Sequence, residues 1–273
     1  MSPAPTLLKL DQRPLLLAGP CAIEGRQTID IACQIADEIS DLGCNWVFKA
    51  SFDKANRTSS EAHRGVGISQ GLDILAEIKE KLNVPIVTDV HLPDHCAQVA
   101  EVADVLQIPA FLCRQTDLLC AAAETTRYVN IKKGQFLSPS SMSHAAQKVE
   151  AMGNNNVMLT ERGTFFGYGG LVVDFSSTPD LRYKDYPLIM DATHAVQQPA
   201  SEGKSTGGDW RRAPILLRAA AANGYDGFFV ETHPRPLESP SDGKNMIPLE
   251  HLKSVLTDTF SFYDLASKSV LRI

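Results

Sequence analysis

The sequence predicts an α/β fold, a single (β/α)8 TIM barrel, mainly from three observations. Eight short apolar runs cross the 273-residue chain and alternate with helical patterns, which predicts parallel strands joined by right-handed crossovers. The runs are nearly all apolar, as in strands that are buried on both faces. Almost every run ends in a residue capable of chemistry, which suits a barrel because its strand ends open onto one active face.

The elements follow one another in a regular order. The apolar runs, each with the polar residues that follow it, are 15–17 with Cys21, 46–48 with Lys49, 85–87 with Asp89, 105–106 with Gln107, 129–131 with Lys132, 157–159 with Glu161 and Arg162, 188–190 with Asp191 and His194, and 228–230 with Glu231. Apolar residues near a 3.6-residue period predict the helices between them. These helices are expected at 28–42, 72–82, 94–103, 117–125, 141–152, 178–183, 212–223 and 249–267.

No linker, repeat or low-complexity tract divides the chain, so residues 1–273 are expected to form one domain. Residues 1–13 are interpreted as an N-terminal extension that covers the bottom of the barrel. Two connections, 52–67 and 197–210, are longer than a barrel requires. The second follows a polar strand end and is rich in Gly, Ser and Lys, which favours an active-site lid over a passive linker.

Composition narrows the class of protein. The net charge of −6 argues against a nucleic-acid surface, and no apolar run approaches the ~20 residues that span a bilayer. The N-terminal stretch lacks the apolar core of a signal peptide. Six cysteines form no C-x-x-C pair, so a cytoplasmic, reducing location is expected. All but Cys21 are expected to be buried free thiols.

Four cations are predicted to meet on the reactive face: Lys49, Lys54, Lys132 and Arg162. An acidic protein that concentrates positive charge in one cleft selects an anion. Arginine binds phosphate or carboxylate through two donors, and lysine supplies a mobile point charge. A single lysine would be a solvated surface charge, but four cations on separate strand ends or loops suit a small, multiply charged ligand such as phosphoenolpyruvate.

A second group has the residue types of a metal site: Cys21, His194, Glu231 and Asp242. A thiolate, an imidazole and two carboxylates suit divalent Zn, Fe, Mn or Co. They are far apart in sequence, but the first, seventh and eighth strands are neighbours in a closed barrel. The pattern leaves open a free core cysteine and a hydrogen-bonded core histidine. His233 is interpreted as a supporting or packing residue.

The segment 48–59 is dense in polar donors and directly follows a strand end. Asn56, Arg57 and Thr58 in this segment are candidates to bind a phosphorylated sugar. A structural turn is the alternative.

These residues resemble a known family. The stretch FKASFDKANR is similar to the signature of the 3-deoxy-D-manno-octulosonate 8-phosphate (Kdo 8-phosphate) synthases. The likeness continues over nearly the whole chain, through AGPCAIE, TDVH, QIPAFLCRQTDLL, NIKKGQF, TERGTFFGYGGLVVDF, DATHAVQ and ETHPRP. The family condenses phosphoenolpyruvate with D-arabinose 5-phosphate and water, and its product, Kdo 8-phosphate, feeds lipopolysaccharide assembly.

The resemblance implies a role for each matching residue. The phosphoenolpyruvate contacts it implies are Lys49, Lys54, Gln107, Lys132 and Arg162. Arabinose 5-phosphate is implied to contact Lys54 and Asn56, with Arg57 and Thr58 reaching its phosphate from a neighbouring subunit of a homotetramer. The resemblance also places Asp89 close to the reacting centre, and the residues we expect to be catalytic are Cys21, Lys54, Asp89 and His194.

The family has a metal-dependent and a metal-free branch, and the metal-free branch carries Asn where this chain has Cys21. The resemblance therefore implies a divalent metal held by Cys21, His194, Glu231 and Asp242. Thr58 replaces the family's usual serine and keeps the hydroxyl. The lid arginine, Arg211, is displaced by one position, so no role is assigned to it.

Three alternatives remain at this stage. The related 3-deoxy-D-arabino-heptulosonate 7-phosphate (DAHP) synthases use erythrose 4-phosphate and share the metal set. They have Pro-Arg after the loop lysine, whereas this chain has Ala55-Asn56-Arg57, which favours arabinose 5-phosphate. A barrel metallohydrolase would gather several histidines, and this chain offers one that is well placed. A non-catalytic sugar-phosphate sensor would bind without turnover.

Overall fold

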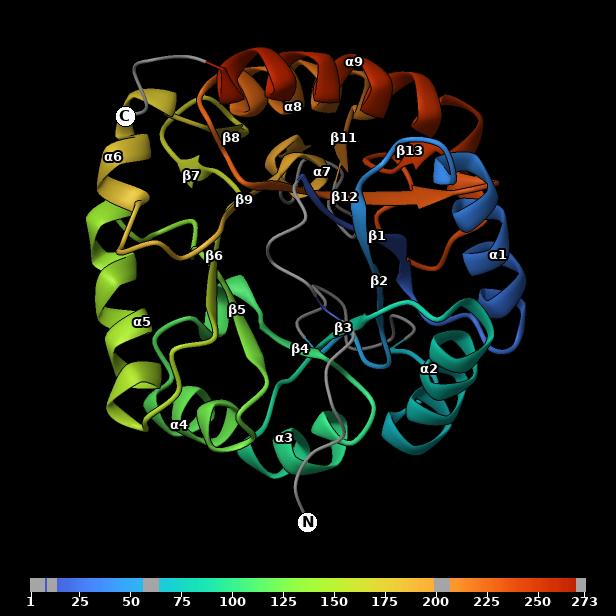
Figure 1. Ribbon diagram of the computed structural model, residues 1–273, viewed down its shortest axis with the longest axis horizontal. Helices are drawn as coiled ribbons and strands as arrows, with labels where there is room; N and C mark the ends of the chain where they lie inside the picture. The colour runs from blue at the N-terminus through green and yellow to red at the C-terminus, as the bar shows by residue number, and fades with distance from the viewer. Residues whose placement is uncertain (1–7, 9–13, 56–63, 199–206, 269–273) are drawn as a thin grey trace.

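Eight parallel strands close into a barrel in the computed structural model, which describes residues 8, 14–55, 64–198 and 207–268. The helices form an outer ring around the strands (Figure 1). The predicted barrel is thus confirmed, and pairing of the first strand with the last closes it. The barrel strands are β1 (Leu15–Ala22), β2 (Asn45–Ser51), β3 (Ile86–Asp89), β4 (Val105–Ile108), β5 (Tyr128–Lys132), β6 (Val157–Glu161), β9 (Leu188–Asp191) and β12 (Gly227–His233).

All eight predicted helices are present, with shifted ends. They are α1 (Gln27–Ile39), α2 (Ile68–Leu82), α3 (Pro93–Ala100), α4 (Thr116–Glu124), α5 (Met142–Ala151), α6 (Thr178–Leu181), α8 (Ala213–Ala222) and α9 (Leu249–Ser267). Helix α2 begins four residues before the predicted start because Gly67, at φ 81°, turns the chain into it. Helix α1 ends three residues before the predicted end, and Gly43, at φ 64°, turns the chain towards β2.

Several short elements escaped the sequence prediction. Helix α7 (Ala192–Ala195) carries His194 directly after β9. Two small antiparallel pairs and one extra strand also form: β7 (Thr164–Phe165) with β8 (Leu171–Val172), β10 (Gln197–Gln198) with β11 (Gly207–Gly208), and β13 (Ile247–Pro248) beside β12. Elements of two to four residues are too short to show a hydrophobic period, so the sequence pattern could not reveal them.

The core has two layers. Apolar side chains between strands and helices form the outer layer, and a smaller cluster fills the barrel interior. The interior cluster comprises Leu8, Leu15, Leu17, Val47, Val87, Val105, Met158, Ile189 and Phe229. Leu8 belongs to the predicted N-terminal extension, and its burial agrees with an extension that covers the barrel. The other residues of 1–13 lie outside the described ones.

Two buried aspartates tie strands together at the start of the barrel. Asp104, just before β4, accepts hydrogen bonds from the backbone N–H of Ile86 (2.9 Å) and from Nζ of Lys79 (2.8 Å). Asp226, just before β12, accepts from the backbone N–H of Leu188 (2.9 Å) and from Nη1 of Arg182 (3.1 Å). Each carboxylate therefore joins the start of its own strand to that of a neighbour.

All six cysteines are free, as expected. Cys96 and Cys113 are buried, but the expectation of burial was wrong for Cys33, Cys44 and Cys120, which are half-buried. Cys33 and Cys120 lie on helices, at the edge of the apolar stripe. A side chain at this edge is partly exposed even though the neighbouring side chains of the stripe are buried. No helix in the described part of the chain is both long and apolar enough to cross a membrane.

Candidate active site

Cys21 reaches the barrel mouth through an irregularity in β1. The pairing of β1 with β2 shifts register between Ala18 and Cys21, and Cys21 adopts a φ of 66°. A Cβ at Gly19 would lie 1.9 Å from the carbonyl oxygen of Lys49, so only glycine permits this approach of the two strands. Asp242 also has a positive φ, 53°. Such backbone conformations are costly for these residue types, and they concentrate at functional sites.

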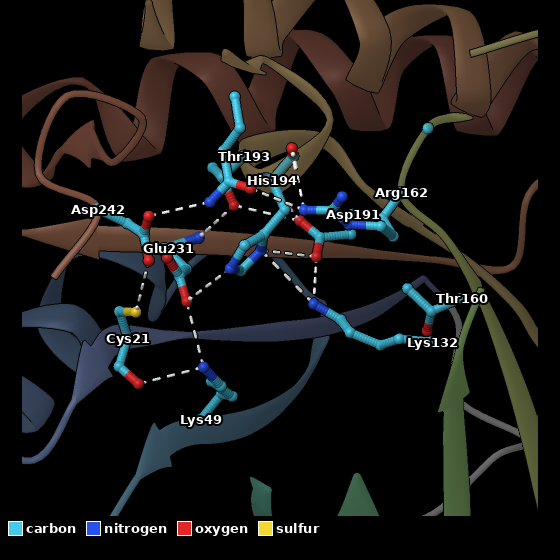
Figure 2. Close-up of polar contacts among 12 residues, drawn as sticks. Cys21, Lys49, Lys132, Thr160, Arg162, Asp191, Thr193, His194, Glu231 and Asp242 are labelled. Carbon is cyan, nitrogen blue, oxygen red and sulfur yellow. Dashed lines mark hydrogen bonds and ion pairs between the residues drawn. The ribbon is translucent and has the colours of Figure 1, made fainter. Parts of the chain in front are cut away.

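Three of the four predicted metal ligands form one group. Ligand atoms of Cys21, Glu231 and Asp242 all lie within 4.8 Å of one another. Sγ of Cys21 donates to Oδ2 of Asp242 at 3.6 Å. His194 is not part of this group of three, but it lies next to it: its Nε2 is 3.5 Å from Oε1 of Glu231 (Figure 2). Oε2 of Glu231 is buried without a hydrogen-bond partner. A thiol, carboxylates and an imidazole around an unused carboxylate oxygen fit a divalent transition metal.

Asp191 orients His194. One oxygen of Asp191 lies 2.7 Å from Nδ1 of His194, and the other accepts the backbone N–H of His194 at 3.0 Å. Burial alone would raise the pKa of Asp191, but His194 and Lys132 lower it. The Asp191 side chain is therefore an ionised carboxylate that accepts, and Nδ1 of His194 is the ring nitrogen that donates to it. The other ring nitrogen, Nε2, then points to Glu231 and is the one left to bind a metal, as in a metal-binding histidine oriented by a carboxylate. The sequence analysis noted Asp191 at a strand end but gave it no role.

The electrostatics of Cys21 bear on metal binding. Burial, together with the Glu231 carboxylate, raises the pKa of the Cys21 thiol to about 12. Cys21 is therefore protonated near neutral pH when no cation is bound. A metal ion would have to displace this proton, because the thiolate is the ligand.

Two buried lysines flank one aromatic ring at the floor of the site. Lys49 donates to the carbonyl oxygen of Cys21 and to Oε1 of Glu231, both at 3.1 Å. Burial opposes its charge, but Glu231 and Asp89 outweigh burial and raise the pKa of Lys49. Its Nζ lies 5.3 Å from the centre of the Phe229 ring, and Nζ of Lys132 lies 3.6 Å from the same point. Both ammonium groups therefore lie within cation–π distance of the same ring.

Lys132 and Arg162 complete the cationic side of the site. Lys132 contacts Asp191, yet burial lowers its pKa. Arg162 follows β6, and its backbone N–H is held by Oε1 of Glu161 at 2.8 Å. Its Nη2 donates to Oε1 of Gln197 at 2.7 Å, while Nη1 is buried without a partner. A buried guanidinium with an unused donor is prepared for an anion.

Asp89 is connected to the metal group through Lys49, which also contacts Glu231. It accepts a hydrogen bond from the hydroxyl of Ser51, which in turn accepts from Nζ of Lys54 at 3.2 Å. Oδ2 of Asp89 is 3.8 Å from Nζ of Lys49. Burial alone would raise the pKa of Asp89, but Lys49 and Lys54 reverse this effect and lower it. Asp89 is therefore an anion between two cations.

A chain of hydrogen bonds reaches Asp89 from three further strands. Oγ1 of Thr160 donates to Oδ1 of Asn130 (2.7 Å), Nδ2 of Asn130 donates to Oε1 of Gln107 (2.9 Å), and Nε2 of Gln107 donates to Oδ1 of Asp89 (2.7 Å). All three donors point towards the carboxylate, which can only accept. The direction of both amides is thereby fixed. Gln107 was predicted from its strand end, whereas Asn130 and Thr160 were not.

Residues 7–262 match the DAHP synthetase I family. A protein from Methylobacterium radiotolerans called 2-dehydro-3-deoxyphosphooctonate aldolase is 52% identical over 256 residues, which is 93% of this chain and 90% of that protein. Proteins with the same name from Desulfatibacillum aliphaticivorans (50% identical, 93% of each chain) and Nitratidesulfovibrio vulgaris (49% identical, 96% of this chain and 97% of that one) are similar over comparable lengths.

The chain belongs to the 2-dehydro-3-deoxyphosphooctonate aldolases within the DAHP synthetase I family. This name is a synonym of Kdo 8-phosphate synthase, so the resemblance drawn from the sequence is confirmed.

In this aldolase, the structure brings most of the predicted site residues together at one end of the barrel. Cys21, Lys49, Asp89, Gln107, Lys132, His194, Glu231 and Asp242 are linked by the contacts described above. Arg162 joins them because its Nη2 donates to the backbone carbonyl oxygen of His194 at 3.4 Å, and Lys54 joins them through Ser51. Asn56, Arg57 and Thr58 lie outside the described residues, as do residues 199–206 of the predicted lid. Arg211 contacts its neighbour Asp209 and stays without an assigned role.

A cavity of about 520 Å³ adjoins the Lys54 side of the rim. Its lining comes from the segments that follow β2, β3 and β4, including the start of α3, and contains Phe52, Asp53, Arg64, His91, His95 and Phe111. This size is within the usual range of small-molecule sites. The cavity could not be predicted from the sequence, because no local pattern marks a space formed between three separate segments.

Proposed function

We propose that this protein condenses phosphoenolpyruvate with D-arabinose 5-phosphate and water to give 3-deoxy-D-manno-octulosonate 8-phosphate and inorganic phosphate, in lipopolysaccharide biosynthesis. One observation carries the proposal: over more than nine-tenths of its length, the chain is about 50% identical in sequence to proteins named for this activity. The clustering of cations and acceptors at the barrel mouth supports it.

The side chains around Phe229 suit phosphoenolpyruvate. Lys49 and Lys132 place two ammonium groups near the ring, and the unused Nη1 of Arg162 offers a further donor. These groups are buried, so their attraction for a carboxylate and a phosphate is weakly screened. We assign phosphoenolpyruvate binding to these three residues together with Gln107 and Lys54.

The reaction joins C3 of phosphoenolpyruvate to the aldehyde carbon of the sugar while water adds at C2. The tetrahedral intermediate then loses phosphate by cleavage of its C–O bond. Lys49, Lys132 and Arg162 stabilise the charge that develops on the phosphate and on the former carbonyl oxygens. Holding both substrates in contact can lower the activation free energy of the reaction by ~7–11 kcal/mol. Asp89, kept ionised by two lysines, is assigned a place close to the reacting centre.

We also propose that a divalent transition metal is bound by Cys21, His194, Glu231 and Asp242, which places the chain in the metal-dependent branch. The mutual proximity of three of these residues, the unused Oε2 of Glu231 and the orientation of His194 by Asp191 support this ligand set. When bound, the metal supplies a Lewis acid for a carbonyl oxygen or for water.

Arabinose 5-phosphate is assigned to the Lys54 side of the rim, where the cavity opens. Asn56, Arg57 and Thr58 are proposed to complete this subsite, the last two from a neighbouring subunit. A homotetramer is proposed accordingly. In its support, the β7–β8 hairpin exposes a group of aromatic side chains, with Phe166 72% and Tyr168 77% exposed, which is typical of a covered surface. The free cysteines favour a location in the cytoplasm.

The substrate assignment is tested by measuring phosphate release from phosphoenolpyruvate with either aldose phosphate. We expect turnover with arabinose 5-phosphate and at least ~100-fold less with erythrose 4-phosphate, which corresponds to ~3 kcal/mol of discrimination. Preference for erythrose 4-phosphate would instead support a DAHP synthase, the activity after which the wider family is named. Binding of both substrates without turnover would support the sensor alternative.

A further inference from the structure

Gln197 connects the two halves of the site through one side-chain amide. Its Oε1 accepts a hydrogen bond from Nη2 of Arg162 at 2.7 Å, and its Nε2 donates to Oδ1 of Asp242 at 2.9 Å. A guanidinium can only donate, and an ionised carboxylate can only accept. The direction of the amide is therefore fixed by its two partners, and Gln197 lies between the proposed anion-binding arginine and a proposed metal ligand.

Asp242 has further contacts on its own side, and Arg162 has an unused donor. Oδ2 of Asp242 accepts from Sγ of Cys21 (3.6 Å) and from the hydroxyl of Ser241 (2.8 Å). Arg162 keeps Nη1 buried without a partner. An anion can thus be bound by Arg162 without breaking its hydrogen bond to Gln197.

Gln197 is also held in place by its strand. It is the first residue of β10 and pairs with Gly208 of β11. Gly208, at φ 156°, lies so close to its neighbours that a Cβ there would be 1.7 Å from Oδ1 of Asn245 and 2.9 Å from the carbonyl oxygen of Val196. This tight packing fixes the position of the amide relative to the barrel.

We propose that Gln197 is a positioning residue that couples cation binding at Asp242 to anion binding at Arg162; this inference depends on the proposed metal site and deepens the proposed function. The positive charge of Arg162 polarises the amide and strengthens its hydrogen bond to Asp242, which draws electron density from the carboxylate. An anion on Arg162 neutralises that charge, so Asp242 becomes a better ligand for a cation. The two ligands therefore bind cooperatively.

The test measures binding without turnover. Cobalt(II) is titrated into the metal-free protein with and without phosphoenolpyruvate, in the absence of any aldose phosphate, and the thiolate-to-cobalt absorption band reports binding. In the wild type we expect phosphoenolpyruvate to tighten cobalt binding about 10-fold, within the usual range of coupling between sites. Direct attraction between the ions contributes to this factor, so we expect Gln197→Met to retain cooperativity of about 3-fold or less.

Two further variants make the result specific. Gln197→Leu checks the loss with a second side chain that cannot bridge, and thermal unfolding of both variants shows that they are folded. Gln198→Leu, on the same strand, should keep the wild-type coupling factor. Because coupling is reciprocal, phosphoenolpyruvate affinity measured by calorimetry with and without cobalt must change by the same factor.

The outcomes separate this inference from the proposed function. Equal coupling in the wild type and in both Gln197 variants overturns the inference and leaves the metal site standing. A wild-type protein that binds no cobalt overturns both the metal site and the inference. If the expected coupling is measured but the protein condenses phosphoenolpyruvate with neither aldose phosphate, the proposed reaction is refuted and the inference is supported.

Discussion

The two ends of the barrel both bury carboxylates, but they use them differently. At the base, Asp104 and Asp226 each accept a backbone N–H of a neighbouring strand and a hydrogen bond from one cation. At the rim, Oε2 of Glu231 and Nη1 of Arg162 are buried without partners. Burial of charge is common to both ends, so it does not distinguish the functional one.

For the charged side chains named here, the difference lies in unused hydrogen-bonding capacity, although the buried hydroxyl of Tyr225 at the base also has no partner. An unpaired buried polar atom costs ~1–3 kcal/mol, so a fold retains it where a ligand restores the missing interaction. A saturated carboxylate such as Asp104 instead stabilises the strand order. Changes at the rim should therefore affect catalysis, and changes at the base should affect stability.

The largest expected effect is that of removing a rim ligand. Cys21→Ala should abolish stoichiometric metal binding and lower kcat at least ~1,000-fold, because Lewis-acid stabilisation contributes several kcal/mol. Elemental analysis and a phosphate-release assay check both effects. Cys96→Ala, which removes a buried thiol from α3, is the matched control and should keep metal and activity. Full activity of Cys21→Ala in the presence of a chelator would contradict the metal proposal, whereas Cys21→Asn is expected to leave a partly active enzyme without metal.

Removal of the rim guanidinium should have the next largest effect. Arg162→Ala should raise the KM for phosphoenolpyruvate ~100-fold, since hydrogen bonds to charged groups contribute ~1.5–3 kcal/mol each. Steady-state kinetics with varied phosphoenolpyruvate measure the change. Arg182→Ala removes a guanidinium paired with Asp226 at the base, and its KM should equal that of the wild type. An unchanged KM in Arg162→Ala would refute the assignment of this residue.

At the base, the expected effect moves from catalysis to stability. Asp104→Asn removes the charge that pairs with Lys79 and should lower the free energy of unfolding by ~1–3 kcal/mol. Urea denaturation measures this loss. Both kcat and KM should stay at wild-type values below the unfolding transition, and a changed KM would contradict the division between rim and base.

The smallest expected effect concerns the hydrogen-bond chain to Asp89. Thr160→Val leaves Oδ1 of Asn130 buried without its donor, so the chain loses the hydrogen bond that anchors the amide farthest from Asp89. We expect kcat/KM to fall ~3–10-fold, in keeping with the ~0.5–1.5 kcal/mol of one neutral hydrogen bond. Thr160→Ser retains the hydroxyl and should restore wild-type kinetics, and equal losses in both variants would point to packing rather than orientation.

Much of the site could be predicted because a barrel turns strand order into spatial order. Lys49, Asp89, Gln107, Lys132 and Glu231 each stand at the end of an apolar run, and closure of the barrel brings all of them to one rim. Asn130 and Thr160 were missed because each lies inside a buried strand, where a polar residue has no sequence pattern that names its partner. Asp191 was noted without a role, since its distance to His194 follows from α7, which is too short to predict.

The sequence by itself determined the alternation of strands and helices, the set of reactive residue types and the family. These follow from periodicity, composition and motifs, which are local properties of the chain. Only the tertiary structure decided which donors are saturated and which remain unused, that His194 approaches Glu231, and that Gln197 joins Arg162 to Asp242. Hydrogen bonds between residues 32 to 221 positions apart depend on distances and angles that arise when the barrel closes, and no local pattern encodes them.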